Sequence, residues 1–168
     1  MPTVLLIDDN AGVIDALALL LSLHDIDTLR AASPEEGLAV LARTPVDLVI
    51  QDMNFSADTT SGREGEALFR DLRARHPDLP VILLTAWTHL ETAVDLVKAG
   101  AADYLAKPWD DRKLVATVNN LLELGEANRA LRKARDSERG LRRAMAGFDL
   151  RGYVFADSQT ARAVHLAC

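Results

Sequence analysis

Four largely hydrophobic runs in this chain each lead into a polar or charged side chain, and this pattern constrains the fold more than any other feature. The runs span residues 4–7, 47–51, 81–84 and 103–106, and they are followed by Asp8 and Asp9, by Asp52, by Thr85 and by Lys107, respectively. Short apolar runs of this kind are typical of strands buried on both faces of a parallel sheet. Ligands of such open α/β sheets bind outside the carboxyl ends of the strands. We therefore expect three carboxylates, a hydroxyl and an ammonium group to meet at one sheet edge.

Helix-like segments separate the strand-like runs over about the first 125 residues. Apolar residues recur at helical spacing after the first run, a short strand follows near residues 27–31, and Ser33 and Pro34 are well suited to begin a helix. Further helices are expected at about 64–75, at 89–98 and from residue 110. This alternation predicts the α/β class: a five-stranded parallel doubly wound sheet, flavodoxin-like, with strand order 2-1-3-4-5. Its switch point, between the first and third strands, is where Asp8, Asp9 and Asp52 would lie.

The chain changes character after Leu124. A seam of residues spaced three and four apart, as in a coiled coil, begins before Leu124 and continues after it. The seam consists of Leu114, Thr117, Leu121, Leu124, Asn128 and Leu131. We therefore predict one long helix from Asp110 to about Ala146, which Gly147 would end. Residues 129–143 contain seven basic and two acidic side chains. We interpret this basic run as the solvated face of the coiled coil, because it lacks aromatic residues that could stack on bases.

Composition narrows the possible functions. No apolar run approaches the ~20 residues of a membrane span, and the start of the chain has no basic region of the kind that opens a signal peptide. The only cysteine is Cys168, so a disulfide framework and a cysteine-based zinc site are excluded. Residues 1–123 hold 20 acidic and 10 basic side chains, net −10, while residues 124–168 hold 5 and 9, net +4. We expect a cytoplasmic protein that does not itself contact nucleic acid or a membrane.

The motifs at the strand ends resemble the response-regulator receiver domain of bacterial two-component signalling, over roughly residues 2–124. The matching segments are Leu-Ile-Asp-Asp-Asn at 6–10, Val-Ile-Gln-Asp-Met-Asn at 49–54, Leu-Leu-Thr-Ala at 83–86, Ala-Gly-Ala-Ala-Asp-Tyr at 99–104 and Lys107-Pro108. Each motif alone is weak. Their occurrence in this order, each at a strand end, is highly specific.

The resemblance implies that Asp52 accepts a phosphoryl group from a sensor histidine kinase. It further implies that Asp8, Asp9 and Asp52 bind Mg²⁺, with the backbone carbonyl of Asn54 as an additional ligand. This assignment agrees with the residue types, because neighbouring carboxylates repel one another and a divalent cation relieves the repulsion. Mg²⁺ favours a site made of a few carboxylates, waters and phosphate oxygens.

Three further residues receive roles from the same resemblance. Thr85 would donate a hydrogen bond to the phosphoryl oxygens, and Lys107 would form an ion pair with them. Tyr104, three residues before Lys107, matches the aromatic residue that moves together with Thr85 as a switch. For Tyr104, packing in the core and a switch function both remain open. The protein would then be a phosphoacceptor switch and not an enzyme, apart from its own phosphorylation and dephosphorylation.

The resemblance also extends to domain organisation. The segment between Phe55 and Glu64 is about five residues longer than in many receivers and resembles those of enhancer-binding transcription activators. Residues 155–166 are similar to the opening of the AAA+ ATPase module of that subfamily, but no Gly-x-x-x-x-Gly-Lys phosphate loop follows. We expect a receiver at 1–124, a helical linker at 125–147 through which the chain forms a homodimer, and the start of an AAA+ output domain at 148–168 that continues beyond this chain.

Other function classes remain as alternatives. A flavin-binding electron carrier would share the fold, but the acidic side chains of Asp8 and Asp9 would repel a flavin phosphate. A phosphohydrolase with an aspartate nucleophile would carry a second aspartate where Asn54 stands, so its turnover would be slow. A receiver-like module that works without phosphorylation would not need every expected site residue. All the expected site residues are present here, which disfavours this alternative.

Overall fold

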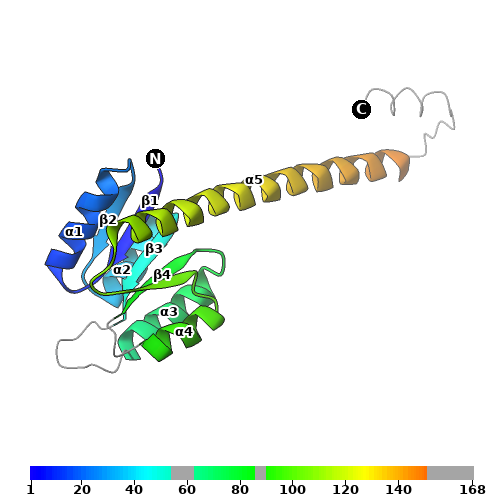
Figure 1. Cartoon of the computed structure of the whole chain (residues 1–168). Helices are drawn as coiled ribbons and strands as arrows, with labels where there is room; N and C mark the ends of the chain where they lie inside the picture. The colour runs from blue at the N-terminus through cyan, green and yellow to red at the C-terminus, as the bar shows by residue number, and fades with distance from the viewer. Residues whose placement is uncertain (54–62, 86–89, 151–168) are drawn as a thin grey trace. The chain divides into compact units, whose positions relative to one another are not determined.

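The computed structural model describes residues 1–53, 63–85 and 90–150, except for the side chains of residues 90 and 147–150. A five-stranded parallel sheet has the order β2-β1-β3-β4-β5, so the predicted fold class and strand order are confirmed (Figure 1). The strands are β1 (Thr3–Ile7), β2 (Asp27–Ala31), β3 (Leu48–Asp52), β4 (Val81–Thr85) and β5 (Asp103–Ala106). The helices are α1 (Ala11–Ser22), α2 (Pro34–Arg43), α3 (Arg63–Arg75), α4 (Leu90–Lys98) and α5 (Asp111–Leu150).

Alternate residues of the central strands point to opposite faces of the sheet, and each face has its own apolar core. One core joins the side chains of Val4, Leu6 and Ile50 to apolar residues of α1 and of the first turns of α5. The other joins Leu5 and Val49 to apolar residues of α2, α3 and α4. Because both faces are covered, the central strands β1, β3 and β4 contain no exposed residue, which explains why they are almost continuous apolar runs in the sequence.

Helix α2 begins as its sequence predicts. The hydroxyl oxygen of Ser33 accepts a hydrogen bond from the backbone N–H of Glu36 at 3.1 Å, and Pro34 occupies the first turn. The carboxylate of Glu36 in turn accepts from the backbone N–H of Ala32 at 2.6 Å. The first bond satisfies the Glu36 N–H, which has no intrahelical partner at the start of the helix. The second bond fixes the chain between β2 and α2.

Helix α5 differs from its prediction in two respects. Leu114 is fully buried in the core on the α1 face and Leu121 packs against that core, so these two residues belong to the domain and not to a coiled-coil seam. The helix also continues through Gly147 to Leu150. A single glycine costs an α-helix only about 1 kcal/mol, which is too little to end it unless the chain also turns there.

The chain divides into two compact units, residues 1–125 and 126–168. In the second unit, α5 exposes apolar side chains, including those of Leu131 and Leu141. Within the described residues, no helix combines the length and the hydropathy that a membrane crossing requires.

Candidate phosphoacceptor site

The carboxyl ends of four neighbouring strands bring the predicted site residues to one edge of the sheet. Asp8 follows β1, Asp52 ends β3, Thr85 ends β4 and Lys107 follows β5. The residues Asp8 and Asp52 are only 2% and 4% exposed, and Thr85 is 1% exposed. Parallel pairing of the strands makes this convergence a direct consequence of the four sequence runs.

Lys107 joins two buried carboxylates. Its ammonium group donates to Asp52 Oδ1 at 2.9 Å and to Asp8 Oδ2 at 3.1 Å, and its backbone N–H donates to the carbonyl oxygen of Thr85 at 2.9 Å. Burial alone would lower the pKa of Lys107, but the hydrogen bonds and negative charges of Asp52 and Asp8 outweigh it, so the pKa is raised. The site therefore holds a firmly charged cation beside Asp52.

The two neighbouring aspartates after β1 have different environments. Asp8 is held rigidly, since its Oδ1 accepts from the backbone N–H of Asn10 at 2.9 Å and its own N–H donates to the carbonyl of Ala31. Asp9 is exposed at the rim. Partial burial and the charge of Asp8 raise the pKa of Asp9, although its backbone hydrogen bond and the charge of Lys107 oppose the shift.

The residues present fit a divalent cation. Asp8, Asp9 and Asp52 each offer one carboxylate oxygen, and these atoms lie within 4.8 Å of one another. Asp8, Asp9 and Asp52 would hold the ion, which would neutralise part of their negative charge. The donor atoms are of the hard oxygen type that Mg²⁺ prefers.

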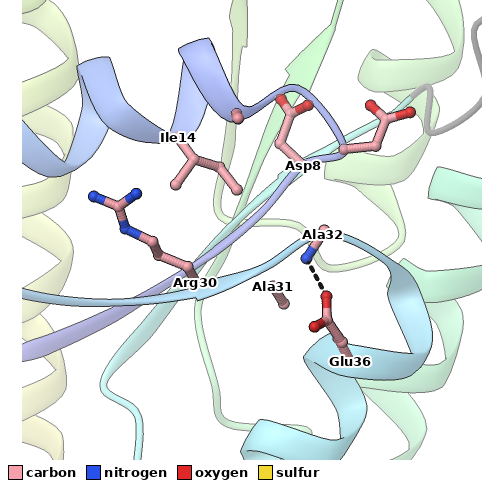
Figure 2. Close-up of a pocket in the computed structure, with 8 residues that line it drawn as sticks. Asp8, Ile14, Arg30, Ala31, Ala32 and Glu36 are labelled. Carbon is pink, nitrogen blue, oxygen red and sulfur yellow. Dashed lines mark hydrogen bonds between the residues drawn. The ribbon is translucent and has the colours of Figure 1, made fainter.

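A pocket of about 240 Å³ lies beside these acids, between the β1–α1 and β2–α2 connections (Figure 2). Figure 2 shows Asp8 at one side of it and the capping pair of Glu36 and Ala32 at the other. The side chains of Ile14 and Arg30 complete the wall. Asp8 and Asp9 line this pocket, whereas Asp52 does not.

The remaining predicted site residues have varied positions. Asn54, predicted to supply a carbonyl ligand, lies outside the described residues. Tyr104 is half-buried and packs against the core on the α3 face, so its ring already contributes to packing. Sequence reasoning gave no role to Gln51, which is fully buried beside Asp52. The available signal was a polar amide at the end of an otherwise apolar buried run.

The comparison with protein families gives one match that covers most of the chain. A family model described as Response regulator receiver domain matches residues 4–119. The response regulator protein FleR of Pseudomonas aeruginosa is 39% identical over 115 residues, which are 68% of this chain and 23% of FleR. The C4-dicarboxylate transport transcriptional regulatory protein DctD of Rhizobium meliloti is 35% identical over 139 residues, 81% of this chain and 29% of DctD. The chain thus spans about a quarter of the length of these curated relatives.

Solved structures agree with this match. NtrX from Brucella abortus, in complex with ADP, superposes with a TM-score of 0.71 at 27% identity and covers 80% of this chain and 29% of its own. The N-terminal signal receiver domain of a two-component system response regulator from Bacteroides fragilis has a TM-score of 0.65 at 35% identity, covering 73% of this chain and 97% of its own.

Proposed function

This chain belongs to the family of response regulator receiver domains of two-component systems, and from that membership we propose that Asp52 is a phosphoryl acceptor for a sensor histidine kinase. The observation that supports this assignment best is the double contact of Lys107, whose ammonium group bonds both Asp52 and Asp8. An ammonium in this position neutralises charge that develops on phosphoryl oxygens next to Asp52.

The transfer is an exchange of one bond for another. A carboxylate oxygen of Asp52 attacks phosphorus, and the bond from phosphorus to the kinase imidazole nitrogen breaks. The electron pair of that bond returns to the nitrogen, and a proton taken from water by the ring lets the histidine leave as neutral imidazole. Lys107 turns from the carboxylates towards the phosphoryl oxygens, and the buried hydroxyl of Thr85 donates a hydrogen bond to one of them. When Mg²⁺ is bound by Asp8, Asp9 and Asp52, it supplies further charge neutralisation for the same oxygens.

Intact-mass measurement tests the acceptor directly. The protein is incubated with a small phosphodonor, with Mg²⁺ or with EDTA, and the added phosphoryl mass is followed over time. We expect the mass to increase with Mg²⁺ in the wild type and in Asp95→Asn, which removes an exposed carboxylate of α4, but not in Asp52→Asn. Full modification of Asp52→Asn, or modification that is independent of Mg²⁺, would contradict the proposal.

We also propose that the exposed part of α5 forms a homodimer. With Leu114 assigned to the core, a linker stripe with 3,4 spacing remains on the helix: Leu124, Ala127, Leu131, Ala134, Leu141 and Met145. Leu131 and Leu141 are 51% and 57% exposed, and a second copy of the stripe would cover them. Glu138 occupies the interrupting position and is paired with Arg142 on the same helix.

Light scattering tests this dimer. Replacing Leu131 by lysine should weaken association at least tenfold, because burial of one leucine contributes about 1.5–3 kcal/mol. Ala130→Lys introduces the same charge on the same helix outside the stripe and should leave the dimer intact. Equal association of the two variants would show that the stripe is not the interface.

The chain fits the receiver part of a longer transcription regulator of the enhancer-binding type. This proposal is supported by the relatives named as transcriptional regulatory proteins, DctD among them, of which the chain spans about a quarter. The coding sequence downstream of residue 168 tests it: a Gly-x-x-x-x-Gly-Lys phosphate loop is expected there. Its absence would leave the receiver assignment intact and remove the AAA+ output domain.

A further inference from the structure

Gln51 is a buried amide in an apolar core. It is 0% exposed, lies on the sheet face covered by α2, α3 and α4, and pairs across the sheet with Ile7 and Leu83. Its Nε2 donates to the carbonyl oxygen of Gly65 at 2.8 Å and to that of Asp52 at 3.3 Å. Both partners are carbonyl oxygens, which only the nitrogen side of the amide can serve, so the orientation of the side chain is determined.

The contact with Gly65 lies at a very close approach of two backbones. Gly65 is in the first turn of α3, and a Cβ placed on it would overlap the Cα and the carbonyl oxygen of Met53. Met53 is in turn fixed to β4, because its N–H donates to the carbonyl of Leu84 at 2.9 Å. The start of α3 therefore abuts the residue that follows Asp52, and Gln51 bonds both sides of the junction.

Stability does not explain why an amide stands here. Among the described residues, Gln51 Oε1 is buried without a hydrogen-bond partner. An unpaired buried acceptor costs about as much as two hydrogen bonds between neutral groups contribute, and an apolar side chain of the same length would gain burial as well. The amide thus gives the fold little net stability, while it provides a direct link between the backbone of Asp52 and the first turn of α3.

We propose that Gln51 is a positioning residue for Asp52. Its amide fixes the first turn of α3 against the carbonyl group of Asp52 and so anchors both ends of the segment that leaves the acceptor and returns to the helix. The position of the Asp52 carboxylate relative to Asp8 and Asp9 depends on that anchor. The inference rests on the proposed function, since it assigns to Gln51 an effect on the Mg²⁺ site.

The test compares Gln51→Met, which keeps the length and volume but removes the donor, with Leu83→Met, a substitution at its cross-strand neighbour in the same core. Mg²⁺ affinity is measured by titration without a phosphodonor, α3 ordering by amide hydrogen exchange, and stability by urea unfolding. We expect Gln51→Met to bind Mg²⁺ about tenfold more weakly, the lower end of what loss of an outer-shell partner costs. Exchange in the first turn of α3 should be faster, and the urea midpoint unchanged or higher. Leu83→Met should behave as the wild type.

Three results would overturn the inference. They are unchanged Mg²⁺ affinity and exchange in Gln51→Met, equal effects in Leu83→Met, and loss of folding in Gln51→Met, which would show that stability is what the amide supplies. Failure of the proposed function can be distinguished from failure of this inference. If the wild type binds no Mg²⁺, or if the wild type and Asp52→Asn bind Mg²⁺ with equal affinity, the metal site itself is refuted. Amide hydrogen exchange in the first turn of α3 of Gln51→Met would then be the only measurement that decides the inference.

Discussion

Replacing Lys107 by methionine should destabilise the metal-free protein strongly and make it unusually responsive to Mg²⁺. The ammonium group bonds Asp52 at 2.9 Å and Asp8 at 3.1 Å, and both carboxylates are almost completely buried. Removal of one partner of a fully buried ion pair costs about 3–5 kcal/mol. Because the Lys107 side chain is 27% exposed, and water reaches its end of the pair, we expect about 2–4 kcal/mol.

The cost of Lys107→Met also depends on pH. The difference in stability between Lys107→Met and the wild type should shrink at alkaline pH. The raised pKa of Lys107 means that its stabilisation is complete below the ordinary lysine value of 10.5 and is lost as the pH rises through the folded-state value.

Urea unfolding in EDTA and in saturating Mg²⁺ measures these terms. Mg²⁺ places positive charge among the same carboxylates, so it should stabilise Lys107→Met more than the wild type and narrow the difference between them. Lys113→Met, at an exposed position of α5, is the matched control and should change stability by less than about 0.5 kcal/mol. If Lys107→Met is as stable as the wild type in EDTA, or if Mg²⁺ stabilises both equally, Lys107 does not compensate the buried acids.

Two further substitutions test the electrostatics and the packing of the site. The raised pKa of Asp9 means that its contribution to the stability of the fold is present below pH 3.8 and is lost as the pH rises through the folded-state pKa. Asp9→Asn should therefore raise the free energy of unfolding at pH 7 in EDTA by up to about 1 kcal/mol. An unchanged melting temperature would contradict this prediction. Gly65→Ala should lower the free energy of unfolding by about 1–3 kcal/mol, because the new methyl group overlaps the backbone of Met53. Gly140→Ala is the control, because its methyl group meets nothing within 4 Å, so the helicity of α5 should increase. A Gly65→Ala variant as stable as the wild type would show that α3 can move away from β3.

The sheet and the charged edge could be predicted because both depend on short stretches of sequence. Each central strand is a run of four or five buried residues, and parallel pairing alone brings Asp52 and Lys107, 55 positions apart, into contact. The seam of α5 could not be assigned in the same way. Spacing of 3 and 4 is shared by a helix that packs on a sheet and by a coiled coil, so Leu114 and Leu131 look alike in the sequence. They differ only in whether the sheet lies beneath them.

Two features of the site depend on contacts that the sequence does not contain. Asp8 and Asp9 are adjacent and identical in type, yet one is buried and the other exposed, because the chain turns between β1 and α1. The function proposed for Gln51 depends on Gly65, which is 14 positions away and on another element. A prediction from local pattern sees the amide as an irregularity in an apolar run and cannot identify its partner.

The close approach of Gly65 to Met53 also bears on how this family can diverge. This contact holds the two ends of the segment after Asp52 together. The geometry of Asp52 therefore does not depend on the length of that segment. Each doubling of a flexible loop adds only about 0.6 kcal/mol of closure entropy, a small term for a domain with two apolar cores. Insertions between residues 53 and 63 are therefore nearly neutral for folding. Added sequence can therefore be accepted in this segment without a change in the contact between Gly65 and Met53.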